Sequence, residues 1–98
     1  MILEKYRNKI DAIDDEIVKL LRKRLNISYK IGKYKTKKNM RIYDKKREIE
    51  IFNKINQKAE RNNLNERFIN KIFKIIIRNS RERQRWQKKQ FHLMTGAN

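Results

Sequence analysis

Cysteine and proline are both absent from this 98-residue chain, and glycine occurs only twice. Without cysteine the chain has no disulfide and no thiolate metal site, and the single histidine, His92, does not make a metal site by itself. Without proline, and with so little glycine, little in the sequence interrupts a helix. The β-branched residues recur at helical spacing, so we expect one all-α domain.

Acidic residues are also scarce, because 11 Asp and Glu stand against 28 Lys and Arg, a formal net charge of +17. Such a field attracts anions of any size, including nucleic acid, anionic membranes and small polycarboxylates, and does not choose among them. A long apolar run is missing as well, and the N-terminus carries Glu4, Lys5, Arg7 and Lys9. We therefore expect no signal peptide, no membrane span and a cytoplasmic location.

Apolar residues at alternating spacings of three and four predict one long helix from about Leu3 to about Lys38, with Asn39 as a left-handed stop. This helix would be about 54 Å long, whereas a compact chain of this size is about 33 Å across. Its apolar stripe runs the whole length, so the overhang needs cover, and a second copy is the economical source. We predict an obligate, intertwined helical homodimer. The stripe consists of Leu3, Tyr6, Ile10, Ile13, Ile17, Leu20, Ile27, Ile31 and Tyr34.

Two shorter helices are predicted to follow. The second runs from about Lys45 to Arg61 after the N-cap Asp44, and the third from about Glu66 to about Lys89 after the N-cap Asn65. Residues 91–98 lack periodicity, so we expect a domain over 1–90 and a disordered tail. The expected inward faces are Glu48, Phe52, Ile55 and Ala59 in the second helix and Ile69, Ile72, Phe73, Ile76, Ser80 and Gln84 in the third.

Arg24 occupies a position of the first helix's stripe where a hydrophobic residue is expected. Burying an unpaired cation costs several kcal/mol, and no acidic residue shares the stripe. The missing anion is either an acid from elsewhere in the chain or a ligand. Lys35 lies about 16 Å further along the same side, and Glu48, Ser80 and Gln84 face the same space from the other helices. These groups fit a small ligand with two anionic groups and a hydroxyl.

Each residue also has a purely structural explanation when it is taken alone. Arg24 fits a snorkelling side chain or a partner of a neighbouring acid, and Lys35 is typical of a solvated lysine. Glu48 suits a helix N-terminus, and Gly32 marks either a close helix contact or room for a substrate. The basic run of the third helix is interpreted as a solvated face, formed by Arg78, Arg81, Arg83, Trp86, Arg85, Lys88 and Lys89.

Several stretches together carry a resemblance that no single one carries alone: Arg7–Asp14, Arg22–Arg24, Ile31–Lys35, Tyr43–Glu48, and Ile75–Ser80 with Gln84. In this order, and without a gap, they resemble the AroQ class of chorismate mutases, over about Leu3 to Gln84. The resemblance implies isomerisation of chorismate to prephenate in the biosynthesis of phenylalanine and tyrosine. This Claisen rearrangement is concerted and needs no nucleophile, metal or cofactor.

The resemblance also implies which residues act on the substrate. The residues matching Arg24 and Arg7 each bind a substrate carboxylate. Arg7 does so from the other subunit, because it lies about 25 Å from Arg24 along the same helix and cannot reach the same site within one chain. The residue matching Lys35 binds a carboxylate and the ether oxygen of the breaking bond, to which Gln84 also donates. Lys35, Gln84 and Arg24 are thus the expected catalytic residues. Since an amide donates at any ordinary pH, we expect flat activity around neutrality, and a Gln84→Glu variant active only in acid.

The remaining matches concern the hydroxyl group on the chorismate ring. Glu48 and the backbone at Asp44 correspond to the groups that hold it, and Arg47 and Ser80 correspond to accessory contacts with the hydroxyl and a carboxylate. The connection departs from the family, because many relatives have a proline before the aspartate and this chain has Tyr43 there.

Other functions stay open at this point. An isochorismate pyruvate lyase on the same fold shares the arginines and the lysine but lacks the carboxylate that matches Glu48, which favours the mutase. A basic helical nucleic-acid-binding module fits the charge. The cations are nevertheless spread over all three helices, and no short recognition helix follows a tight turn, so nucleic acid is the less favoured partner. A helical adaptor with an inactive site is disfavoured by the intact set of pocket residues.

Overall fold

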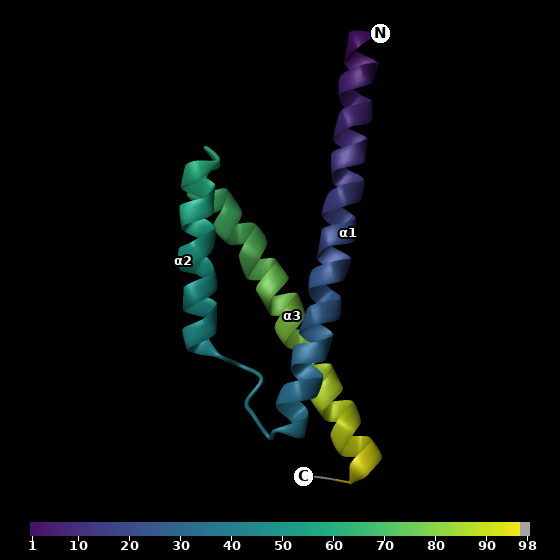
Figure 1. The fold of residues 1–98 in the computed structure, drawn as a ribbon, viewed down its shortest axis with the longest axis vertical. Coiled ribbons are helices and arrows are strands. Elements are labelled where there is room, and N and C mark those ends of the chain that lie inside the picture. Colours follow the sequence, from purple (N-terminus) through teal and green to yellow (C-terminus); the bar gives the residue numbers. More distant parts are fainter. Residues whose placement is uncertain (97–98) are drawn as a thin grey trace.

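The computed structural model describes residues 1–96, and this part of the chain forms three helices joined by two short connections (Figure 1). Helix α1 spans Ile2–Lys37, α2 spans Lys45–Arg61 and α3 spans Glu66–Thr95. No strand occurs among these residues. The predicted all-α class and the order of one very long helix and two shorter ones are confirmed. None of the three helices described is both long and apolar enough to cross a bilayer.

Capping side chains set the beginnings of α2 and α3. Asp44 Oδ1 accepts a hydrogen bond from the backbone N–H of Arg47 at 3.0 Å, and Asn65 Oδ1 accepts one from the N–H of Phe68 at 2.9 Å. Each cap satisfies an N–H that has no partner inside its helix. Beyond the end of α1, Asn39 has the left-handed φ of 55° that its predicted role as a stop requires.

The third helix is longer than predicted. It continues well past the expected end at Lys89, so the tail expected from Phe91 onward is wrong for the described residues. Side chains 90–92 are half-buried, and this packing keeps the last turns helical although the sequence shows no clear stripe there. The helix ends at Gly96, whose left-handed φ of 69° costs a glycine little. Residues 97–98 of the expected tail lie outside the described part of the chain.

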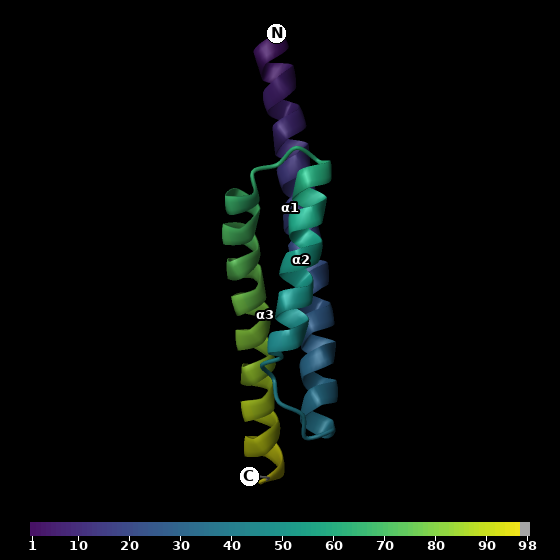
Figure 2. The ribbon, with the colours of Figure 1, turned by 90° about the vertical axis from the view of Figure 1, so that its left-hand side faces the viewer.

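Helix α3 is the centre of the arrangement, because it packs against both α1 and α2 while those two do not pack against each other. The N-terminal end of α1 projects beyond the other helices in both views (Figures 1 and 2). The chain measures 61 × 28 × 15 Å with a radius of gyration of 17.5 Å. A compact chain of about 100 residues has a radius of gyration of about 13 Å, so a single copy is far from globular.

The core of one copy is correspondingly small. Among the described residues the buried hydrophobic side chains are Ile42, Ala59 and Ile77, and no large side chain is fully buried. The inward face predicted for α2 is confirmed, since Glu48 is half-buried and Ala59 is only 2% exposed.

The apolar stripe of α1 is not buried within one copy of the chain. Its members from Leu3 to Leu20 are 50–60% exposed, and those from Ile27 to Tyr34 are 43–59% exposed. A repeat of strictly three and four residues drifts by about 20° per heptad around a straight helix. The stripe therefore turns away from the side of α1 that meets α3.

Small residues form the surface that α1 does pack against α3, namely Ser28, Gly32 and Thr36, all of which are buried. A Cβ atom at Gly32 would lie 2.5 Å from Gln87 Oε1, closer than real Cβ contacts, and 3.0 Å from Gln84 Cα, which is tighter than most of them. Of the two interpretations of Gly32, the close helix contact is the right one.

Candidate active site

A cavity of about 260 Å³ lies where the three helices and the α1–α2 connection meet. Its volume is near the lower end of small-molecule sites. All the predicted site residues except Arg7 line it. They are Arg24 and Lys35 from α1, Asp44 from the connection, Arg47 and Glu48 from α2, and Ser80 and Gln84 from α3. The fold thus gathers around one space side chains that are far apart in the sequence.

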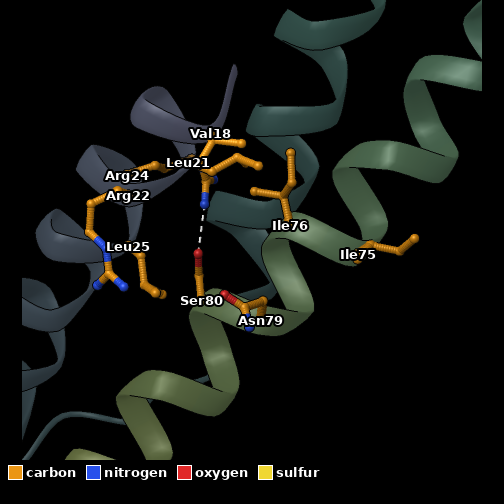
Figure 3. A pocket seen from close by; sticks show the side chains of 9 residues that line it. All are labelled: Val18, Leu21, Arg22, Arg24, Leu25, Ile75, Ile76, Asn79 and Ser80. Carbon is orange, nitrogen blue, oxygen red and sulfur yellow. Dashed lines mark hydrogen bonds between the residues drawn. The ribbon is translucent and has the colours of Figure 1, made fainter. Parts of the chain in front are cut away.

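Arg24 points from α1 across to α3, where its Nη1 donates to Ser80 Oγ at 2.6 Å (Figure 3). No carboxylate pairs with Arg24 in the part of the chain that the structure covers. Burial lowers the pKa of Arg24 below its ordinary value, and the positive charge of Arg47 lowers it further. Of the two possible sources of the missing anion, an acid of the same chain is therefore ruled out over residues 1–96. An anion in the cavity would oppose both causes of the lowered pKa.

Lys35, the second cation of the cavity on α1, is held by a neutral acceptor. Its Nζ donates to the backbone carbonyl of Ile42 at 2.9 Å. Ile42 itself is 7% exposed, so the connection is anchored at this point. An ammonium group has three donors, and the bond to Ile42 leaves others for a ligand.

Both carboxylates of the cavity are already engaged within the chain. Asp44 caps α2, and Glu48 forms an ion pair with Arg81, with Nε and Oε2 3.1 Å apart and Nη2 and Oε1 3.2 Å apart. Arg24 and Lys35 therefore face the cavity with only neutral oxygen partners. Two cations without anionic partners in a partly enclosed space favour a ligand with two negative groups.

Gln84 is held at the closest approach of α1 and α3, beside Gly32. It is 8% exposed, and its Oε1 atom is buried without a hydrogen-bond partner. The tight contact leaves this side chain little freedom, so its amide is a preorganised group in the cavity wall.

Arg81 is a cavity residue that the sequence interpretation missed. It was assigned to a solvated basic face, and this is wrong, since it lines the cavity and pairs with Glu48. Its guanidinium also lies over the ring of Tyr43, 5.0 Å from the centroid. A signal was available, because position 81 is four residues after Ile77 and three before Gln84, on the same face of the helix.

The remainder of the basic run divides in two. Arg78, Arg85, Trp86 and Lys89 are exposed, as interpreted, whereas Lys88 is half-buried. Arg83 instead is half-buried and lies 5.2 Å from the ring centroid of Tyr29 and 4.6 Å from that of Trp86. A cation over aromatic rings stabilises the α1–α3 contact on the outside of the pair.

Gln87 was also missed. It is 7% exposed, and its Oε1 atom has no hydrogen-bond partner. It follows Ser80 and Gln84 along the buried face of α3, so the predicted polar end of that face extends one turn further.

Arg7 is the predicted site residue that the single chain does not bring to the cavity. It is exposed on the projecting half of α1, about 25 Å along the helix from Arg24. The cavity wall is also incomplete, because Ile27 and Ile31 line it yet are 57% and 43% exposed.

Comparison with known proteins gives consistent matches. The family model described as chorismate mutase type II matches residues 6–85. The chorismate mutase of Methanocaldococcus jannaschii is 31% identical over 83 residues, which are 85% of this chain and 84% of that protein. The bifunctional chorismate mutase/prephenate dehydratase of Buchnera aphidicola subsp. Schizaphis graminum is 37% identical over 75 residues, 76% of this chain and 20% of that protein. Its counterpart from Aquifex aeolicus is 45% identical over 53 residues, 54% of this chain and 15% of that protein. The chain thus spans about a fifth or less of the length of these two bifunctional relatives.

Proposed function

Because the chain belongs to the type II chorismate mutase family, we propose that it converts chorismate to prephenate. Chorismate carries two carboxylates and a ring hydroxyl. The observation that carries the proposal is the state of Arg24 and Lys35, which face one cavity with neutral partners while both of its carboxylates are engaged elsewhere. The substrate supplies the anions that this arrangement lacks.

The reaction breaks the ether C–O bond while a new C–C bond forms within the same molecule. Arg24 binds one carboxylate and Lys35 the other, and this holds the flexible enolpyruvyl group folded over the ring. Such positioning lowers the activation free energy by several kcal/mol. Lys35 and Gln84 donate to the ether oxygen, where negative charge grows as the bond breaks. Because this charge is largest in the transition state, the two donors lower the barrier.

The other end of the cavity binds the ring hydroxyl. Glu48 accepts a hydrogen bond from it, and the backbone N–H of Asp44 supports the same group. Arg47 contributes positive charge beside it. Ser80, whose oxygen accepts from Arg24, retains its own hydroxyl hydrogen to donate to a substrate carboxylate.

We further propose that the active enzyme is an intertwined homodimer in which the partner supplies Arg7. The exposed stripe of α1 and the radius of gyration of 17.5 Å support this assembly. Full burial of each Leu, Ile or Tyr of the stripe would contribute about 1.5–3 kcal/mol. The partner's α1 would also cover the open wall at Ile27 and Ile31.

The activity is tested by following the loss of chorismate absorbance with the purified protein. The wild type should convert chorismate, and Arg24→Ala should lower kcat/KM by about 100-fold or more, the scale of losing a charge-assisted donor in a desolvated site. Arg78→Ala, an exposed arginine on α3, is the matched control and should be unaffected. Absence of turnover by the folded wild type would disprove the proposal, and release of pyruvate from isochorismate would point to the lyase instead.

The shared site is tested by mixing two inactive variants, Arg7→Ala and Arg24→Ala. In a mixed dimer one of the two sites receives Arg24 from one chain and Arg7 from the other, and is complete. Random reassociation places half of the subunits in mixed dimers, so mixing should restore about a quarter of the wild-type activity per site. If the mixture of the two variants stays inactive after its subunits have dissociated and reassociated, Arg7 does not act across the interface.

A further inference from the structure

Arg81 lines the cavity but has no part in the proposed mechanism. We propose that it is a positioning residue, which holds the Glu48 carboxylate toward the ring hydroxyl and away from the cations that bind the substrate carboxylates. This inference rests on the proposed mutase function.

The contact between Arg81 and Glu48 is a two-point contact. Nη2 donates a hydrogen bond to Oε1 at 3.2 Å, and Nε lies 3.1 Å from Oε2 in an ion-pair contact without hydrogen-bond geometry. A hydrogen bond to one carboxylate oxygen together with the guanidinium charge beside the other restrains the orientation of the carboxylate as well as its position. The side chains are only 28% and 19% exposed, so solvent screens this pair less than an ordinary surface ion pair.

The guanidinium of Arg81 is in turn restrained by the connection between α1 and α2. It lies 5.0 Å from the ring centroid of Tyr43, the residue directly before the cap of α2. Tyr43, Glu48 and Arg81 come from the connection, α2 and α3 respectively, so this cluster ties together the elements that form the hydroxyl end of the cavity.

The charges around Glu48 explain why such a restraint is needed. Arg24, Lys35 and Arg47 line the same cavity, and a free carboxylate among them would turn toward one of these cations. It would then neutralise a group that the substrate needs. An ionised carboxylate has about four acceptor positions, and the contact with Arg81 leaves some of them for a ligand hydroxyl.

The test is a double-mutant cycle of Arg81→Met and Glu48→Gln, with kcat and KM for chorismate measured separately. Arg81→Met alone should raise KM about tenfold with little change in kcat, the scale of one charge-assisted hydrogen bond. In the Glu48→Gln background the same substitution should change KM by less than about twofold, because Arg81 acts through Glu48. Arg85→Met, an exposed arginine one turn along α3, is the matched control and should leave both constants unchanged.

The outcomes separate this inference from the function on which it rests. An inactive wild type overturns the mutase function. An active wild type with an equal KM penalty for Arg81→Met in both backgrounds, or with no penalty in either, overturns the positioning role alone. Arg81→Lys covers the case in which Arg81→Met fails to fold. It keeps the charge but loses the planar fork, so it should show a smaller rise in KM that also vanishes in the Glu48→Gln background, and a rise that persists there overturns the role.

Discussion

The two halves of α1 differ in what they pack against within one chain. From Arg24 onward, small side chains bring α1 into close contact with α3, and Arg24 and Lys35 face the cavity. Before Val18, every residue of α1 is exposed, and the N-terminal end of the helix projects beyond α2 and α3 (Figure 1). One continuous helix therefore provides a site-forming surface at one end and an uncovered apolar surface at the other.

The difference lies in which side chains each half uses. Packing against α3 depends on Ser28, Gly32 and Thr36, whose small size allows the backbones to approach. The projecting half carries large aliphatic and aromatic side chains at the heptad spacing typical of helices that wrap around a partner helix. One half thus needs small side chains and the other needs a partner for its large ones. Substitutions in the two halves should therefore have different effects on assembly, stability and activity.

The largest effect is expected from placing charges in the uncovered half, as in the double variant Ile10→Asp with Ile13→Asp. Sedimentation equilibrium should show loss of the dimer, and chorismate turnover should fall to background, because two carboxylates replace apolar side chains in the proposed subunit interface. Lys19→Asp, on the opposite side of the same helix, should have no such effect. An active dimer of the double variant would show that this stripe is not the interface.

The next largest effect is expected at the packed half, for Gln84→Glu. At neutral pH an ionised glutamate cannot donate to the ether oxygen, so kcat should fall by about 100- to 1,000-fold. Activity should recover as the pH is lowered, since the protonated carboxyl donates again, and burial raises the pKa of such a group. The wild-type pH profile should be flat around neutrality. Equal activity of the variant at pH 5 and pH 8 would contradict the assigned role of Gln84.

A moderate effect is expected for Gly32→Val. The new side chain meets Gln87 and the backbone of Gln84, so α1 and α3 must separate, at a cost of about 1–3 kcal/mol in the free energy of unfolding. Activity should fall as well, because Lys35 follows on the same helix. Urea denaturation measures the first and chorismate turnover the second. Lys33→Val, at an exposed neighbouring position, controls for the helix propensity of valine.

The smallest effect on stability is expected for Arg24→Met. Burial, and then Arg47, lower the pKa of Arg24, so the folded chain binds this proton less tightly than the unfolded chain does. The charged Arg24 guanidinium therefore lowers the free energy of unfolding at every pH below its lowered pKa. This destabilisation disappears only as the pH rises through that pKa. At pH 7 the variant should therefore melt at the same or a higher temperature while losing activity. A lower melting temperature would mean that the bond to Ser80 outweighs the cost of burial.

Much of the fold was predictable because helix signals are local. The boundaries of α2 follow from Asp44 at its start and from the charge and spacing of the residues behind it, and both N-caps are where the sequence placed them. The end of α3 was not predictable in the same way. Residues 90–92 show no stripe, and only their packing explains why the helix continues to Thr95.

The members of the candidate site were also largely predictable, because a charged or amide group on an apolar face is conspicuous at helical spacing. Their partners were not. The pairing of Glu48 with Arg81, and the neutral partners of Arg24 and Lys35, depend on distances between helices that spacing within one helix does not contain.

The amino-acid sequence by itself determined that this chain is helical, where its caps lie and which polar side chains interrupt its apolar faces, since each depends on neighbours within a few residues. Only the tertiary structure decided which side of α1 meets α3. A stripe with a 3.5-residue repeat gradually rotates around a helix with 3.6 residues per turn. The closest approach of α1 to α3 therefore occurs at small residues outside that stripe. That contact turns the large apolar stripe outward and leaves Arg24 and Lys35 facing a shared cavity.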